Sequence, residues 1–251
     1  MTKTLAQEQF GKTAASYLDS RPHARGSSLQ ALLEKLEPKP LWHVLDVATG
    51  AGHVAYTFAP FVEKVIATDV TQEMLDVVSR ELMRRQIFNV EVQAAKAEAL
   101  PFGDSNFDAV ISRIAPHHFD DIALFLGEAR RVLKPGGHLA IVDNVVPDND
   151  VGDYINAFER FRDPSHVRAL SVSEWVREIE GAGYRIDYQD CFSKTLHFEE
   201  WAARHDANMQ AFLRAMLSQG SAQAMQELEP TAVQGGLTFR LKEGFFVASK
   251  A

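Results

Sequence analysis

Short apolar segments alternate with stretches of helical period along residues 41–145, and this alternation limits the possible folds more than any other feature. The helical stretches carry apolar residues three and four positions apart, as Met74, Leu75, Val78 and Leu82 are. We predict strands over residues 42–47, 65–69, 90–94, 107–112 and 138–143. Strands that alternate with helices form βαβ units around a parallel sheet, so the sequence predicts a doubly wound α/β fold.

The rest of the chain adds helices and a final pair of strands. Further helices are predicted over residues 28–36, 121–133, 173–181 and 199–226. Ser28 and Ser173 are candidate N-caps, and Pro38 ends the first of these helices because proline cannot continue one. The tail is expected to form a strand hairpin with its turn near residues 242–244.

Composition and charge exclude several classes of protein. The chain has 26 Lys and Arg against 34 Asp and Glu, a net charge of −8, which disfavours a nucleic-acid partner. Cys191 is the single cysteine and cannot form an internal disulfide, as expected in a reducing compartment. The start lacks the pattern of a secretion signal, and no apolar run is long enough to span a bilayer. We therefore expect a cytoplasmic, globular protein with a small-molecule partner; the oligomeric state is not predicted.

The segment 44–55 is a glycine-rich turn between a strand and a helix. Asp46 ends the strand, Gly50 and Gly52 allow a ligand to approach the backbone closely, and Asp69 ends the next strand, where a carboxylate can bind a ribose diol. The spacing also satisfies the loose glycine pattern of nicotinamide dinucleotide sites. However, the Asp46 carboxylate would repel a pyrophosphate and would suit a cofactor with a sulfonium and an ammonium group. Such a cofactor is S-adenosylmethionine.

Four segments in order resemble a known family. They are VLDVATGAGHVA at 44–55, ATDVTQEML at 67–75, AEALPFGDSNFDAVISR at 97–113 and RVLKPGGHLAIVD at 131–143. Together they resemble the class I S-adenosylmethionine-dependent methyltransferases, specifically the type 11 group of the ubiquinone and menaquinone biosynthesis kind. The start QFGKTAASY, at 9–17, is similar to the N-terminal lid of that group.

This resemblance implies one methyltransferase domain over residues 1–251, with a mostly parallel, seven-stranded, Rossmann-like sheet. Residues 1–40 would form an N-terminal lid and helix, and residues 41–145 the cofactor-binding core. Residues 146–251 would form an acceptor-side lid and complete the sheet with a C-terminal hairpin. The implied cofactor residues are Tyr17, Asp46, Ala48, Gly50, Gly52, Asp69, Val70, Met74, Ala97, Glu98 and Arg113.

Two positions depart from the family pattern. Ala48 replaces the first glycine of the turn motif, a change that is tolerable if its φ angle is negative. Lys96 stands where the family commonly has an aspartate that accepts a hydrogen bond from the adenine amino group, and lysine cannot accept one. We then expect the backbone near Ala97, or Glu98, to hold the adenine.

His117 and His118 follow the fourth predicted strand and are the candidate catalytic residues. One of them could act as a general base with a pKa near the working pH, and the alternative is a structural histidine beside the next helix. Asp143, at the end of the fifth strand, is another possible base. His166 and Arg168 could contact a polar acceptor, although a solvated segment is the simpler interpretation.

A metal site is not expected. Asp143 and Asn144 resemble the Asp-Asn pair of metal-dependent catechol-type O-methyltransferases, but magnesium there needs a further carboxylate after the fourth strand. This chain has Arg113 at that place, which would repel a divalent cation.

The function implied is methyl transfer from S-adenosylmethionine to a small-molecule acceptor by in-line displacement, with S-adenosylhomocysteine as product. A quinol-like acceptor is compatible with the resemblance. Two alternatives are a nicotinamide-dependent oxidoreductase and a non-catalytic protein of the same fold that binds the cofactor. No Tyr-x-x-x-Lys proton donor supports the oxidoreductase.

Overall fold

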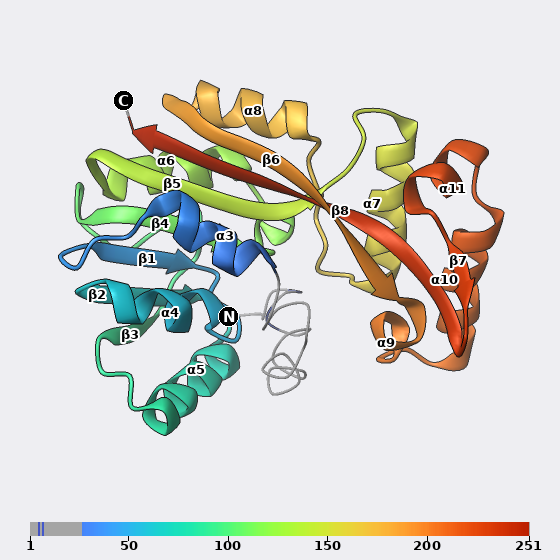
Figure 1. Ribbon diagram of the computed structural model, residues 1–251, viewed down its shortest axis with the longest axis horizontal. Coiled ribbons are helices and arrows are strands. Elements are labelled where there is room, and N and C mark those ends of the chain that lie inside the picture. The colour runs from blue at the N-terminus through green and yellow to red at the C-terminus, as the bar shows by residue number, and fades with distance from the viewer. Residues whose placement is uncertain (1–4, 6, 8–26, 251) are drawn as a thin grey trace.

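A twisted sheet with helices on both faces forms the core of the computed structural model, which describes residues 5, 7 and 27–250 (Figure 1). The strands are β1 (His43–Val47), β2 (Lys64–Asp69), β3 (Val90–Ala94), β4 (Phe107–Arg113), β5 (Leu133–Val145), β6 (Tyr184–His197), β7 (Thr231–Val233) and β8 (Gly236–Lys250). The α-helices are α3 (Ser27–Leu36), α4 (His53–Phe58), α5 (Gln72–Arg85), α6 (Ile122–Val132), α7 (Asp150–Arg162), α8 (Val172–Gly181), α9 (Phe198–Ala202), α10 (Ala207–Gln219) and α11 (Ala222–Leu228). Short 3₁₀ turns cover η1 (Ala59–Phe61) and η2 (Pro116–His118).

The sheet order is β3-β2-β1-β4-β5-β8-β6, and the short β7 pairs with β8 outside this path. Strands β1 to β5 are parallel, and β8 is antiparallel to both β5 and β6. This confirms the predicted doubly wound, mostly parallel sheet. The strand order reverses between β1 and β4, and ligands bind at such a switch point, outside the carboxyl ends of the strands.

Alternate residues of the central strands enter two separate apolar layers. Val44 and Ala140 pack in the layer covered by α3, α4 and α5, and their neighbours Leu45 and Ile141 pack in the layer covered by α6 and α8. Both faces are therefore buried, which explains why the strands read as continuous apolar runs rather than as alternating ones.

The far halves of β6 and β8 continue past the edge of the sheet and carry a second group of elements (Figure 1). We call α7, α9, α10, α11, β7 and these strand ends the helical cluster. It has its own apolar core, in which Phe158, Phe198 and Phe239 are fully buried or nearly so. The predicted helix over residues 199–226 is in fact the three helices α9, α10 and α11.

Three local predictions are wrong. Ser28 lies inside α3, which begins at Ser27, and α8 is capped by Ser171, not by Ser173. The predicted turn at residues 242–244 does not exist, because β8 runs unbroken through it and the hairpin turn lies between β7 and β8. Gly244 is needed there for packing, since a Cβ on it would meet Cγ1 of Val145 at 2.7 Å. Over the described residues no helix is both long and apolar enough to cross a membrane.

Candidate functional site

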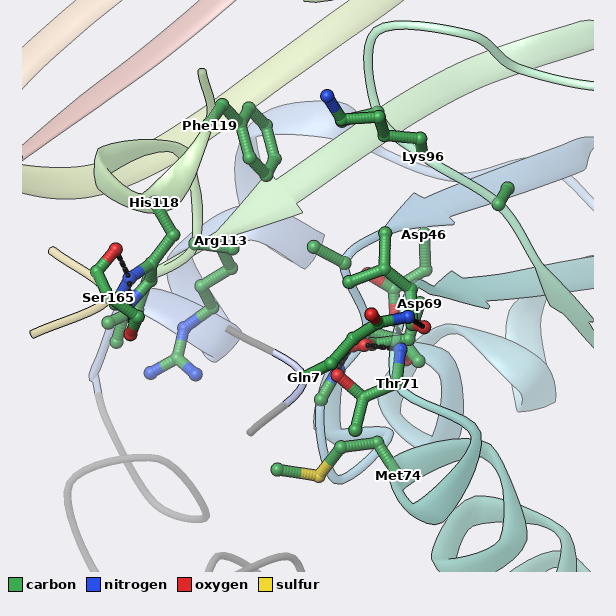
Figure 2. A pocket seen from close by; sticks show the side chains of 18 of the residues that line it. Gln7, Asp46, Asp69, Thr71, Met74, Lys96, Arg113, His118, Phe119 and Ser165 are labelled. Atoms are coloured by element: carbon green, nitrogen blue, oxygen red, sulfur yellow. Dashed lines mark hydrogen bonds between the residues drawn. The ribbon is translucent and has the colours of Figure 1, made fainter. Parts of the chain in front are cut away.

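A cavity of about 590 Å³ opens at the carboxyl ends of β1, β2, β3 and β4, where the strand order reverses (Figure 2). The predicted cofactor residues that line it are Asp46, Ala48, Gly50, Asp69, Val70, Met74, Ala97, Glu98 and Arg113. His118 lines it as well, whereas His117 and Gly52 do not. Tyr17 lies outside the residues that the structure describes. The structure thus brings most of the predicted site together around one cavity.

Asp46 lies at the floor of the cavity and is 1% exposed. Its Oδ2 accepts hydrogen bonds from Thr49 Oγ1 at 2.6 Å and from the Ala55 amide at 3.2 Å, so this carboxylate holds the glycine turn to the start of α4. Burial raises the pKa of Asp46 to about 7. A cation bound beside it would favour its charged form, so the residue is poised to respond to a positively charged ligand.

The glycine turn, residues 48–52, has three positive φ angles. Gly50 has φ of 54° and a Cβ placed on it would meet nothing within 4 Å, so a side chain there would occupy open space in the cavity wall. Ala48 has φ of 56°, so the condition under which alanine would be tolerated easily is not met; the alanine adopts the left-handed conformation that glycine would adopt without strain. Gly52 is needed for another reason, because its Cβ would meet the ring of Tyr56 at 2.5 Å.

Asp69 ends β2 and closes the turn from the other side. Its Oδ2 accepts from the Gly50 amide at 3.0 Å and its Oδ1 from the Thr71 amide at 2.9 Å. Burial raises the pKa of Asp69, while these amides oppose that rise. Each oxygen retains a further lone pair, so the carboxylate can still accept from two vicinal hydroxyl groups at the cavity surface.

The far end of the cavity, beyond Asp69, is lined by Val70, Met74 and Ala97 and is suited to a flat apolar ring. Lys96 also lies at this end, and its Nζ donates a hydrogen bond to Asp120 Oδ2 at 2.8 Å. Glu98 is also engaged, since its Oε1 accepts from the Asp120 amide at 2.9 Å.

Arg113 extends from the end of β4 into the cavity (Figure 2). It is 9% exposed, and its Nε donates to the Oγ of the buried Ser28 at 3.0 Å. Burial lowers the pKa of Arg113, and the carboxylates of Glu243 and Asp46 oppose that change. The guanidinium is therefore a buried positive charge in the wall of the cavity.

The two histidines of η2 have different surroundings. His117 lies behind the cavity, where its Nδ1 bonds Asp143 Oδ1 at 2.6 Å. Burial lowers the pKa of His117 and raises that of Asp143, so the imidazole is neutral at neutral pH. A neutral imidazole donates from Nδ1 to this carboxyl group when the latter is ionised.

His118 lies at the cavity wall, with its ring centroid 4.2 Å from that of His117. Its Nδ1 is 2.9 Å from the Ser165 carbonyl oxygen and 3.2 Å from Ser165 Oγ (Figure 2). Burial, followed by the neighbouring His117, lowers the pKa of His118 to about 4, so the expectation of a pKa near the working pH is wrong for this residue. Ser165 contacts Asp163. Neither residue was predicted from the sequence as part of the site, because no motif marks the loop after α7.

His166 and Arg168 do not line the cavity. His166 is buried and its Nε2 is 2.8 Å from Asn156 Oδ1, whereas Arg168 forms an ion pair with Glu174 at 2.7 Å. Their neighbours Ser165 and Val167 do line the cavity, so the loop was correctly placed and the residues within it were not.

These residues fit S-adenosylmethionine. The buried carboxylate of Asp46 suits the cationic end of that molecule, and Asp69 suits its ribose. The open space over Gly50 admits a ligand where any side chain would block it. The two carboxylates that line the cavity beside the turn would repel a pyrophosphate.

Comparison with known proteins gives one consistent result. Residues 45–141 match the family model described as a methyltransferase domain. An uncharacterized methyltransferase of Bacillus subtilis, YcgJ, is 37% identical over 198 residues, which is 78% of this chain and 78% of that one.

Solved structures agree. The crystal structure of Bacillus subtilis YcgJ has a TM-score of 0.83 and 32% identity, and the match covers 89% of this chain and 97% of that one. A methyltransferase candidate from Bacillus halodurans has a TM-score of 0.85 and 38% identity, covering 90% of this chain and 99% of that one.

Proposed function

The chain belongs to the class I S-adenosylmethionine-dependent methyltransferases. We therefore propose that its cavity holds S-adenosylmethionine and that the methyl group of this cofactor is transferred to a small-molecule acceptor. The cofactor supplies an electrophilic methyl group on a cationic sulfur. The assignment of the cofactor-binding residues rests mainly on the geometry of the glycine turn. Its two flanking carboxylates, Asp46 and Asp69, line the same cavity as Gly50, over which there is open space.

In this proposal each group of the chain has a limited task. Asp46 orients the positive methionyl end, and Asp69 accepts from the ribose hydroxyls. Val70 and Met74 pack against the adenine, while the backbone near Ala97 contacts its edge, since Lys96 is held by Asp120. Methyl transfer by in-line displacement then needs mainly alignment of the acceptor and exclusion of water.

The half of the cavity beyond Arg113 is where the acceptor is expected. Apolar groups of its wall come from Ile114, Ala115, Phe119, Pro164 and Val167, and His118 and Ser165 are the polar groups among them. A quinol-like acceptor suits this composition, because it has an apolar ring and an ionisable hydroxyl. Chlorobaculum parvum demethylmenaquinone methyltransferase, 37% identical over 46% of this chain, supports the same class.

Calorimetry with S-adenosylhomocysteine tests the cofactor site. We expect Gly50→Val and Asp69→Ala each to weaken binding by at least about 100-fold, the first by filling the ligand space and straining a positive φ, the second by removing the ribose acceptor. Gly103→Val and Asp104→Ala, on an exposed loop away from the cavity, are matched controls that should bind normally. Unchanged affinity in both site variants would refute the assignment.

Turnover with methyl-labelled cofactor tests the acceptor. We expect label to enter reduced quinols or related phenols and not aliphatic amines or carboxylic acids, because the acceptor half of the cavity is apolar and holds a neutral histidine. The Gly50→Val variant is the blank for background transfer. Preferential labelling of the amines would contradict the quinol-like acceptor while leaving the cofactor site intact.

A further inference from the structure

The loop that follows α7 packs directly on η2 and determines how His118 is held. The amide groups of Val167 and Arg168 both donate to the His117 carbonyl, at 2.9 Å and 3.1 Å. Ser165, two residues earlier than Val167, contacts the His118 ring. Two segments that are 47 residues apart in sequence thus meet at the cavity wall.

The directions of the hydrogen bonds in this contact can be assigned. Asp163 Oδ1 accepts from Ser165 Oγ at 2.5 Å and from the Ser165 amide at 3.1 Å. An ionised carboxylate can only accept, so the hydroxyl hydrogen of Ser165 points to Asp163. The lone pairs of that hydroxyl, and the Ser165 carbonyl, are then left to accept from His118. Its Nδ1 must therefore carry the proton.

Asp163 is held in its ionised form. Although burial by itself raises its pKa, the neighbouring His118, Arg204 and the Ser165 hydroxyl hold the pKa of Asp163 well below its usual range. Arg204 contributes an ion pair of 3.1 Å to Oδ2. A fixed negative charge therefore lies one hydroxyl group away from the imidazole.

We propose that Asp163 and Ser165 are positioning residues that fix His118 as its Nδ1–H tautomer, so that Nε2 is the general base of the methyl transfer. This inference rests on the proposed function. It narrows the acceptor to a compound whose nucleophilic atom carries a weakly acidic proton, such as a phenol or an enol. A carboxylate, with a lone pair already available at neutral pH, would need no such group.

In the proposed step, proton loss from the acceptor accompanies methyl transfer. The acceptor gives its proton to Nε2 of His118 and forms a bond to the methyl carbon, whose bond to sulfur breaks with the electron pair left on sulfur. Nδ1 keeps its proton throughout, and the imidazolium so formed is stabilised by Asp163 through Ser165. The proton then passes to solvent after the products leave.

Histidine nitrogen NMR on the protein with S-adenosylhomocysteine tests the proposal without an acceptor. We expect the His118 resonances of the wild type to show protonated Nδ1 and unprotonated Nε2 at neutral pH. In Asp163→Asn the titration midpoint of His118 should fall by about one unit or more, because the compensating negative charge is removed; in Ser165→Ala it should fall by less, because the charge of Asp163 and the Ser165 carbonyl remain. Asp148→Asn, an exposed carboxylate away from η2, is the matched control.

Other titratable groups face this ring and set the background of the titration. They are His117 on η2, Asp143 on β5, and His166 on the same loop as Asp163. None of them is changed in the test variants. A wild-type His118 with protonated Nε2, or an unchanged midpoint in both variants, would overturn the proposal. Loss of S-adenosylhomocysteine binding by the wild type would instead refute the proposed function, so the two failures are distinguishable.

Discussion

At the scale of single residues, the buried carboxylate of Asp46 makes the stability of the folded chain depend on pH. Its pKa is about 7 in the folded chain, against an ordinary value of 3.8. Between these two values the folded state binds more protons than the unfolded state, so stability falls as the pH rises through this window. Above about pH 7 the Asp46 carboxyl group is ionised in both the folded and the unfolded state, so its destabilising effect on the folded state no longer changes with pH.

Asp46→Asn should remove that slope. We expect the cofactor-free variant to gain stability relative to the wild type as the pH rises from 4 to 7, by up to a few kcal/mol at neutral pH. Denaturant unfolding at several pH values measures this. The same slope in variant and wild type would show that Asp46 is not the group responsible. S-adenosylhomocysteine affinity should fall in the variant, because an amide cannot balance the ammonium group.

Some residues of the candidate site could be predicted from the sequence, and others could not. Asp46, Gly50 and Asp69 were predictable because the turn motif sets their spacing within one βαβ unit. The conformation of Ala48 was not, because its φ angle is imposed by the turn around it. Asp163 and Ser165 were beyond reach, since their role depends on a contact with η2 that no local pattern encodes.

At the scale of elements, the parallel core followed from the alternation of strands and helices, and the errors come from one missed local signal and from one place where strand pairing overrides a local signal. Both Ser171 and Ser173 can cap a helix, but Ser171 has Glu174 three residues later and forms the reciprocal capping box with it. Gly244 carries the ordinary signal for a turn. In the sheet it stands opposite Asp143, where β8 passes close to β5, so strand pairing decides its conformation.

At the scale of the whole molecule, the site depends on two parts of the chain, the sheet with its two apolar layers and the helical cluster with a core of its own. The two layers of the sheet fix Asp46, Asp69 and Arg113 at strand ends. The helical cluster ends α7 immediately before Asp163, and therefore places the loop that contacts His118. We infer that residues 27–250 form one domain, because β6 and β8 run through both parts, yet the sheet and the helical cluster can differ in local stability.

Phe158→Ala separates these two contributions. Phe158 is fully buried in the helical cluster, with its ring 4.7 Å from Trp201, and its truncation should cost about 3–5 kcal/mol. Hydrogen exchange should accelerate in α7, α9 to α11 and at the Val167 amide, while the amides of β1, β2 and β4 keep their protection. Phe125→Ala, which removes a fully buried ring from α6, is the matched control and should expose the core amides. Equal loss of protection throughout Phe158→Ala would mean that the sheet and the helical cluster unfold as one unit, and the loop holding His118 could then not move independently of the cofactor half.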